Sequence, residues 1–173
     1  GSMKSLKISD YEAIAKLEGV KAASPMTNGS YVVIYQNKNW TTSVSGVSYN
    51  YLDVNNWSMK SGRFLSEKNV QNRERVAVVG KTVVKNLFGD EDPVGAEIRV
   101  KNIPFRIIGV LNSKGSGAMG NDQDDMVIIP YTTAMERVEG VDYLRMIYVV
   151  GKDENGIDRL QSDIENLLRV RHG

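Results

Sequence analysis

Hydrophobic and polar residues alternate most regularly over residues 96–101. A period of two is typical of a half-buried strand. Residues 105–110 are apolar at nearly every position, which indicates a second strand lying deeper in its sheet. The short segment 101–104 suits a hairpin turn, and Asn102 is its best residue for a positive φ. We therefore expect a central β-hairpin, introduced by a turn at residues 92–95.

The same patterns predict helices and strands on both sides of this hairpin. The last helix is the clearest, because Ile157, Leu160, Ile164, Leu167 and Leu168 recur at helical spacing on one face. Strands are expected over residues 31–35, 40–47, 75–80, 126–129 and 144–150. Other helices are expected from a cap at Ser9 or Asp10, from a cap at Thr82 through Phe88, and from a cap at Thr132 or Thr133 to about residue 139. Helices and strands at both chain ends around a strand-rich middle predict an α+β fold.

Composition narrows the classes of function. The 173 residues suit one domain or two small ones, and 41% apolar residues are enough for a core. A formal net charge of +1 argues against nucleic-acid binding through a basic face. The chain has no cysteine, which excludes disulfides, thiolate catalysis and cysteine metal sites. Its apolar runs are strand-sized, so we expect no membrane span and no signal peptide, and residues 1–3 are typical of an expression-tag scar.

The segment Gly115–Gly120 matches the dinucleotide pattern G-x-G-x-x-G. That chemistry requires the last glycine to open a helix whose amides hold the pyrophosphate. Here the loop runs into Asn-Asp-Gln-Asp-Asp at residues 121–125, which repels phosphate, and then into a predicted strand. We expect a surface loop and no cofactor, with a nucleotide-dependent enzyme as the weakest alternative.

Two groups of oxygen-bearing residues invite a metal-site hypothesis. They are Asp122, Asp124 and Asp125, and Asp153, Asn155 and Asp158. Neither group has the full set of alternating ligands of a calcium loop, so no metal site is expected. His172 is the only histidine, which excludes the usual hydrolase triads, and no catalytic residue is expected.

An aromatic patch is the main candidate for contacts with a ligand or partner. Tyr49, Tyr51 and Trp57 belong to it, in a stretch expected to be less regular, although aromatics near strands are more often core. Lys114, Ser116 and Asp122, in and after the glycine-rich loop, are the other candidates for such contacts. This patch motivates an alternative reading, a ligand-sensing module.

Short motifs spread over most of the chain match a known family in their order and spacing. They are Gly19-Val20, Ser24-Pro25, Gly46-Val47, Gly62-Arg63-Phe64, residues 76–80, Leu87-Phe88, residues 92–95 and 105–110, Gln123-Asp124-Asp125, Ile129-Pro130-Tyr131 and Arg171-His172-Gly173. With them the chain resembles the extracytoplasmic (periplasmic core) domain of a MacB-type ABC transporter permease, inserted between its first and second membrane helices.

The resemblance implies a discontinuous fold. A porter-like subdomain is expected from residues 1–54 and 139–173, and a strand-rich Sabre-like subdomain is expected from residues 55–138 inserted between them. Ile103 departs from the family, because relatives often carry glycine in this hairpin turn.

The resemblance also implies a function outside the cytoplasmic membrane. The domain would couple ATP hydrolysis in a cytoplasmic nucleotide-binding domain to movement outside the membrane (mechanotransmission), for export of antibiotics, peptides or toxins. Implied partners are the permease membrane helices, a second permease copy, a cytoplasmic ATP-binding subunit or domain, and a membrane-fusion adaptor protein. The alternatives are a sensing module for antimicrobial peptides, or the domain of a lipoprotein-sorting or cell-division permease.

Overall fold

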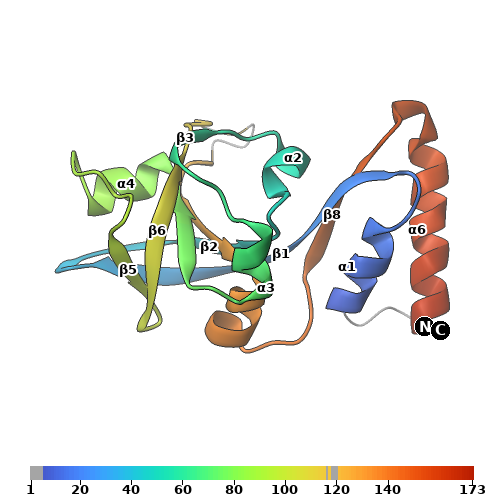
Figure 1. The fold of residues 1–173 in the computed structure, drawn as a ribbon, viewed down its shortest axis with the longest axis horizontal. Helices are drawn as coiled ribbons and strands as arrows, with labels where there is room; N and C mark the ends of the chain where they lie inside the picture. Colours follow the sequence, from blue (N-terminus) through green and yellow to red (C-terminus); the bar gives the residue numbers. More distant parts are fainter. Residues whose placement is uncertain (1–5, 116, 118–120) are drawn as a thin grey trace.

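The computed structural model describes residues 6–115, 117 and 121–173. The described strands are β1 (Val20–Tyr35), β2 (Lys38–Val47), β3 (Met59–Gly62), β4 (Val76–Val79), β5 (Glu97–Val100), β6 (Ile103–Leu111), β7 (Met126–Pro130) and β8 (Met146–Gly151). The described helices are α1 (Ile8–Ala15), α2 (Tyr51–Asn55), α3 (Glu67–Gln71), α4 (Lys81–Leu87), α5 (Tyr131–Thr133), the π-helix η1 (Ala134–Glu139), the 3₁₀ helix η2 (Glu154–Gly156) and α6 (Ile157–His172). Figure 1 shows their arrangement, and the α+β prediction is confirmed.

Six of the strands close into a barrel in the order β1-β2-β7-β4-β6-β5, because β5 pairs back onto β1 at Val33 and Ile34. The pairs β2–β7 and β4–β6 are parallel, and the other four are antiparallel. The interior is filled by fully buried apolar side chains such as Ile98, Phe105 and Ile107. Closure removes the free edges that these strands would otherwise expose.

The predicted central hairpin forms part of this barrel. β5 and β6 pair with Val100 opposite Ile103, and Lys101 and Asn102 have φ of 51° and 65°. Two consecutive residues with positive φ are typical of a type I′ turn, whose twist matches that of the strands. Ile103 therefore lies in β6 rather than in the turn, which explains why a β-branched residue is accepted there.

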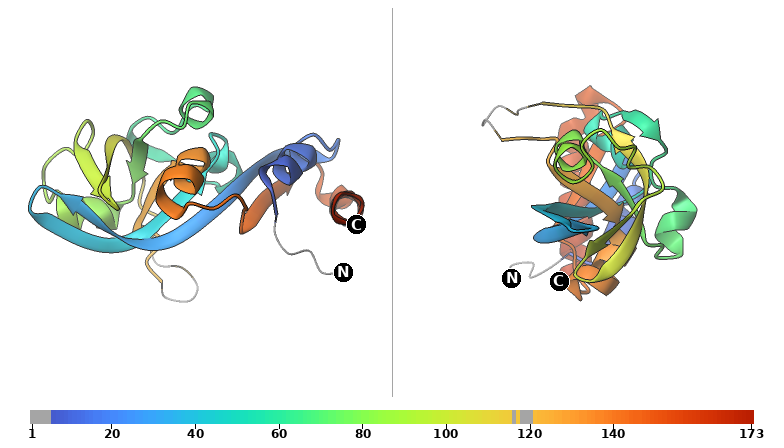
Figure 2. Two further views of the ribbon diagram at one scale, coloured as in Figure 1. Left: turned by 90° about the horizontal axis from the view of Figure 1, so that it is seen from below. Right: turned by 90° about the vertical axis from the view of Figure 1, so that its left-hand side faces the viewer.

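β1 belongs to two parts of the molecule. Its second half, from Met26 onward, pairs with β2 in the barrel, while its first half pairs with β8 in a two-stranded ribbon. At about 3.3 Å per residue, its 16 residues reach roughly 50 Å. Figure 2 shows this strand running from the barrel to α1 and α6. β1 and β2 come from the predicted porter-like segment, yet they complete the barrel of the predicted insertion, and the division into two subdomains stays a prediction.

The ribbon is covered by the first and last long helices. Ile14 of α1 and Leu160 of α6 are buried together with Val20 and Ala23 of β1. The apolar face predicted for the last helix is largely confirmed, since Ile164, Leu167 and Leu168 pack against this cluster. Ile157 is the exception, because it lies at the start of the helix and is 45% exposed.

Three local predictions were wrong. The stretch expected to be irregular after Tyr49 contains α2. Thr82 does not cap α4, which begins one residue earlier, and its hydroxyl donates to Asp122. Thr132 and Thr133 follow the start of α5 and donate instead to the carbonyl oxygens of Val70 and Glu74. In each case a tertiary hydrogen bond or packing contact outweighs the local preference.

Candidate functional site

The first turn of α1 holds a buried carboxylate. Asp10 is 1% exposed, and its Oδ2 atom accepts a hydrogen bond of 2.8 Å from the backbone amide of Lys7. Lys7 occupies the cap position, so the predicted cap at Ser9 or Asp10 is wrong as to position. Asp10 instead satisfies the free amide of the cap residue from three positions inside the helix, as in the second half of a capping box.

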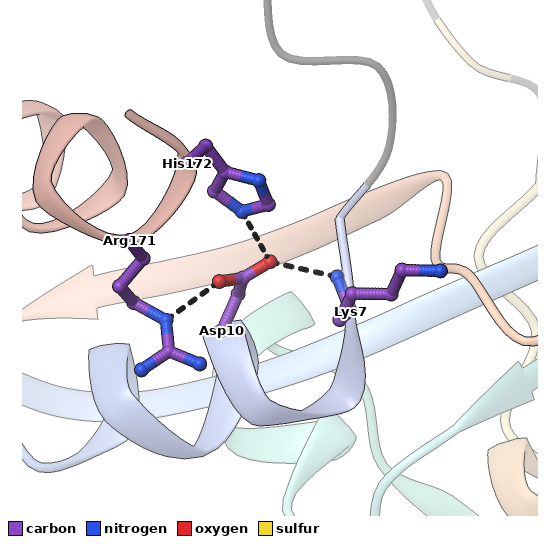
Figure 3. A network of polar contacts seen from close by, with 4 residues as sticks. All are labelled: Lys7, Asp10, Arg171 and His172. Atoms are coloured by element: carbon purple, nitrogen blue, oxygen red, sulfur yellow. Dashed lines mark hydrogen bonds and ion pairs between the residues drawn. The ribbon is translucent and has the colours of Figure 1, made fainter.

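The same carboxylate binds the other end of the chain. Arg171 Nε donates to Asp10 Oδ1 at 2.7 Å, and His172 Nε2 lies 2.8 Å from Asp10 Oδ2. Figure 3 shows the three side chains converging, and we call Lys7, Asp10, Arg171 and His172 the terminal clamp. The partners are separated from Asp10 by 161 and 162 residues.

The electrostatics of the terminal clamp favour an ionised Asp10. Burial by itself raises the pKa of this carboxyl, but the hydrogen bonds from Arg171, the Lys7 amide and His172 outweigh burial and hold the pKa below its ordinary value. The position in the first turn of α1 adds the favourable end of the helix dipole. Asp10 therefore carries a negative charge at neutral pH, and the arginine of α6 neutralises it.

Apolar contacts reinforce the terminal clamp. α1 and α6 share the cluster around Ile14 and Leu160, and Leu6 forms an isolated β-bridge with Leu144 just before β8. The first helix, the last helix and the ribbon between them thus form one packed unit. Both ends of the described chain therefore belong to the same unit, and β1 continues from it into the barrel.

A groove separates α1 from the barrel side of the molecule. Its volume is about 460 Å³, and its walls come from α1 and α3, with Ser48, Tyr49 and Tyr131 between them. The Tyr11 hydroxyl donates to Ser48 Oγ at 3.4 Å, and the rings of Tyr11 and Tyr131 meet edge to face at 5.9 Å. Burial is the main cause that raises the pKa of both tyrosines, to about 12 for Tyr131. Both phenols therefore stay neutral hydrogen-bonding groups. We call this space the α1–α3 groove.

The aromatic candidates have different surroundings. Tyr49 is 44% exposed and lies in the α1–α3 groove. Tyr51 is 3% exposed, accepts a hydrogen bond from Asn55, and packs edge to face on Tyr148, as a core residue does. Trp57 lies apart from both tyrosines and makes a cation–π contact with Lys114. Ligand or partner contacts by these residues stay a prediction.

Trp57 and Lys114 are the two candidates that the fold brings together. The Lys114 ammonium lies 4.7 Å from the centre of the indole ring and donates to the carbonyl oxygen of Asn55 at 3.0 Å. The indole Nε1 donates to the carbonyl oxygen of Asn112 at 2.8 Å. Asp122 lies elsewhere and accepts from Thr82, and Ser116 lies outside the described residues.

The acidic run after the glycine-rich loop binds the described start of that loop, residues 113–115. Asp124 is buried and accepts from Ser113 Oγ, the Lys114 amide and the Gly115 amide at 2.6–3.0 Å. Asp125 accepts from the side chains of Trp40 and Thr42. β7 follows this run, whereas a dinucleotide site needs a helix there. Among residues 6–115, 117 and 121–173, no group of three or more His, Asp or Glu side chains is arranged to hold a metal ion.

The sequence did not reveal two features of these sites. Asp10 was interpreted only as a helix cap, although the Arg-His pair near the chain end was a weak signal for a carboxylate partner. Tyr11 and Tyr131 gave no local signal at all, because residues 120 apart meet only in the folded chain. Within the part of the chain that the structure describes, no helix is long and apolar enough to cross a membrane.

Comparison with known proteins places the whole chain in one family. Residues 1–167 match the family described as MacB-like periplasmic core domain. A macrolide export ATP-binding/permease protein MacB from Rhodospirillum rubrum is 42% identical over 175 residues, covering 100% of this chain and 27% of that protein. The same-named protein from Marinobacter nauticus is 37% identical over 172 residues, covering 99% of this chain and 27% of its own length. The chain thus spans about a quarter of the length of these relatives.

Solved structures agree with this assignment. The periplasmic region of MacB from Actinobacillus actinomycetemcomitans superposes with a TM-score of 0.88 at 28% identity, covering 99% of this chain and 76% of that one. The extracellular domain of the noncanonic ABC-type transporter YknZ from Gram-positive bacteria has the same fold, with a TM-score of 0.85 at 20% identity over 98% of this chain and 85% of its own. This chain belongs to the family of MacB-like periplasmic core domains, the extracytoplasmic part of ABC transporter permeases.

Proposed function

We propose that this domain passes movement from permease membrane helices to the extracytoplasmic side, driven by ATP hydrolysis in a cytoplasmic nucleotide-binding domain. The observation that carries the proposal is the terminal clamp, in which one buried carboxylate ties the first turn of α1 to the last turn of α6. A domain displaced through both of its ends has to move as a rigid body if small tilts are not to be absorbed locally.

The long strand β1 supports the same proposal. It leaves the cluster beneath α1 and α6 and enters the barrel without interruption, paired along its length with β8 and then β2. A continuous hydrogen-bonded strand is stiffer than a loop, so motion of the helices reaches the barrel rather than bending a linker. The proposed partners are the membrane helices, a second permease copy, an ATP-binding subunit or domain, and an adaptor protein. The proposed cargo class is antibiotics, peptides or toxins.

The test uses the complete permease reconstituted in liposomes, with Asp10→Asn compared with Asp163→Asn. Asp163 is an exposed acid of α6 that pairs with Arg159 only at 4.0 Å, so it controls for loss of one carboxylate. Loss of the terminal clamp should lower transport more than ATP hydrolysis, whereas the control should change neither. Equal transport and hydrolysis in both variants, with both folded, would show that the two ends need not be tied together.

The proposal also places nucleotide binding outside this domain. Isothermal titration of the 173-residue chain with ATP and with NAD should therefore give no saturable heat. Tight binding of either nucleotide would favour the enzyme alternative, with the glycine-rich loop as its site.

One observation favours ligand sensing as a second function. Tyr49 of the aromatic patch opens into the α1–α3 groove, whose walls belong to the helix of the terminal clamp and to the barrel side. A ligand in that space would touch both.

A further inference from the structure

The α1–α3 groove has the size and the mixed lining of a small-molecule site. Its volume of about 460 Å³ lies within the roughly 300–1,000 Å³ usual for ligand pockets. Ile8 and Ala15 of α1 and Val70 of α3 supply apolar surface, and Ser48 supplies a hydroxyl. Such a lining can bury the body of an organic ligand while polar groups fix its orientation.

Acidic side chains stand on both walls of the α1–α3 groove. Glu12 comes from α1 and Glu67 from α3, and both residues are exposed. Both carboxylates line the groove together with Tyr11, and their charges add to burial in raising the pKa of its phenol. Two negative charges on the two walls create a negative potential inside the space between them.

Neither carboxylate is neutralised by an ion pair. Within residues 6–115, 117 and 121–173, no basic nitrogen lies within 4.0 Å of Glu12 or Glu67. Among these described residues, the Glu67 carboxylate accepts a hydrogen bond only from the side-chain amide of Gln71, at 3.3 Å. Lys16 lines the same space one turn after Glu12, so the charges of these three side chains sum to −1. The negative charge is therefore available to a ligand.

Aromatic rings add a second attraction for positive charge. Tyr11 and Tyr131 are fixed edge to face, and Tyr49 is 44% exposed beside them. The face of an aromatic ring carries a partial negative charge, which attracts ammonium groups within about 6 Å of the ring centre. Three tyrosines beside two carboxylates form a surrounding that suits cations and repels anions.

We propose that the α1–α3 groove binds a small organic cation with an apolar or aromatic body. Its positive charge lies between Glu12 and Glu67, and its body rests against Tyr11, Tyr49 and Val70. This site belongs to the folded domain itself, so its occupancy is independent of whether the domain transmits movement.

The test uses two probes of nearly equal shape and opposite charge, tetraphenylphosphonium and tetraphenylborate. Isothermal titration of the 173-residue chain should give saturable binding of the phosphonium and much weaker binding of the borate. Glu12→Gln combined with Glu67→Gln should weaken phosphonium binding by about tenfold or more. Tyr49→Ala should weaken it severalfold, and neither change removes a buried side chain.

The matched control is Glu154→Gln combined with Glu165→Gln, two exposed acids outside the α1–α3 groove. It changes net charge equally and should leave phosphonium affinity within about twofold. The proposal is overturned if the phosphonium does not bind, if the borate binds as tightly, or if the two double variants weaken binding equally. In NMR spectra, the backbone amide signals that shift when the phosphonium is added should belong to α1 and α3. Shifts confined to other elements would also overturn the proposal.

Discussion

His172 Nε2 lies 2.8 Å from Asp10 Oδ2, so the only histidine of the chain, which is the last residue of α6, contacts the first turn of α1. Arg171 occupies the other oxygen of the same carboxylate at 2.7 Å. The contact joins residues that are almost as distant in sequence as the chain allows. The first and last helices are therefore held together by specific polar side chains as well as by apolar packing.

Replacement of Asp10 should destabilise the fold substantially. Asp10→Asn removes the charge that pairs with the partly buried Arg171 and leaves one acceptor oxygen for the Arg171 and Lys7 donors, which should cost about 1–3 kcal/mol of unfolding free energy. Urea unfolding of the 173-residue chain measures this change. The matched control Asp163→Asn removes an exposed pair and should cost less than about 0.5 kcal/mol. Equal effects of the two substitutions would show that the terminal clamp does not stabilise the fold.

The terminal clamp should also make stability depend on acid. The pKa of Asp10 is lower in the fold than in the unfolded chain, so the unfolded state binds protons first as pH falls. Its contribution is complete above about pH 5 and disappears as pH falls through the folded pKa. The difference in unfolding free energy between wild type and Asp10→Asn should therefore shrink as pH falls below about 5. A difference that stays constant over that range would contradict the ionised role of Asp10.

A tight contact at Gly46 should make the barrel sensitive to one methyl group. A Cβ atom at this position of β2 would lie 2.6 Å from the Cβ of Ala134 and 2.8 Å from the Cα of Tyr131. Gly46→Ala should cost about 1–3 kcal/mol, because the backbone of α5 cannot yield easily. Gly156→Ala serves as the control, since its nearest atom would be 3.8 Å away. Thermal unfolding of both variants should separate them by several degrees.

The glycine-rich loop should depend on its acidic support and not on its glycines. Asp124→Ala deprives two backbone amides and the Ser113 hydroxyl of a buried acceptor and should cost about 2–3 kcal/mol. Gly117→Ala meets only the ends of the Asn121 and Gln123 side chains, which can rotate, so it should cost less than about 1 kcal/mol. Chemical denaturation compares the two. A larger loss from Gly117→Ala would mean that this glycine has a structural role of its own.

Patterns of neighbouring residues were sufficient to predict the central hairpin and the last helix. The alternation over residues 96–101 predicted the first strand of the central hairpin, and the positive φ predicted for Asn102 is confirmed. The apolar spacing from Leu160 to Leu168 predicted the last helix. Both predictions succeeded because the side-chain period of a strand or helix and the backbone preference of each residue are local properties, set by neighbours a few positions away.

The sequence by itself determined most of the strands and helices, the absence of cysteine chemistry and the family of the domain. Only the tertiary structure decided that β1 closes a barrel and that Asp10 joins the two chain ends. It also decided that Tyr11 and Tyr131 face each other beside a groove. The physical reason is distance along the chain: a hydrogen bond or ring contact across more than 100 residues depends on the path of the entire backbone, and no pattern of neighbouring residues encodes that path.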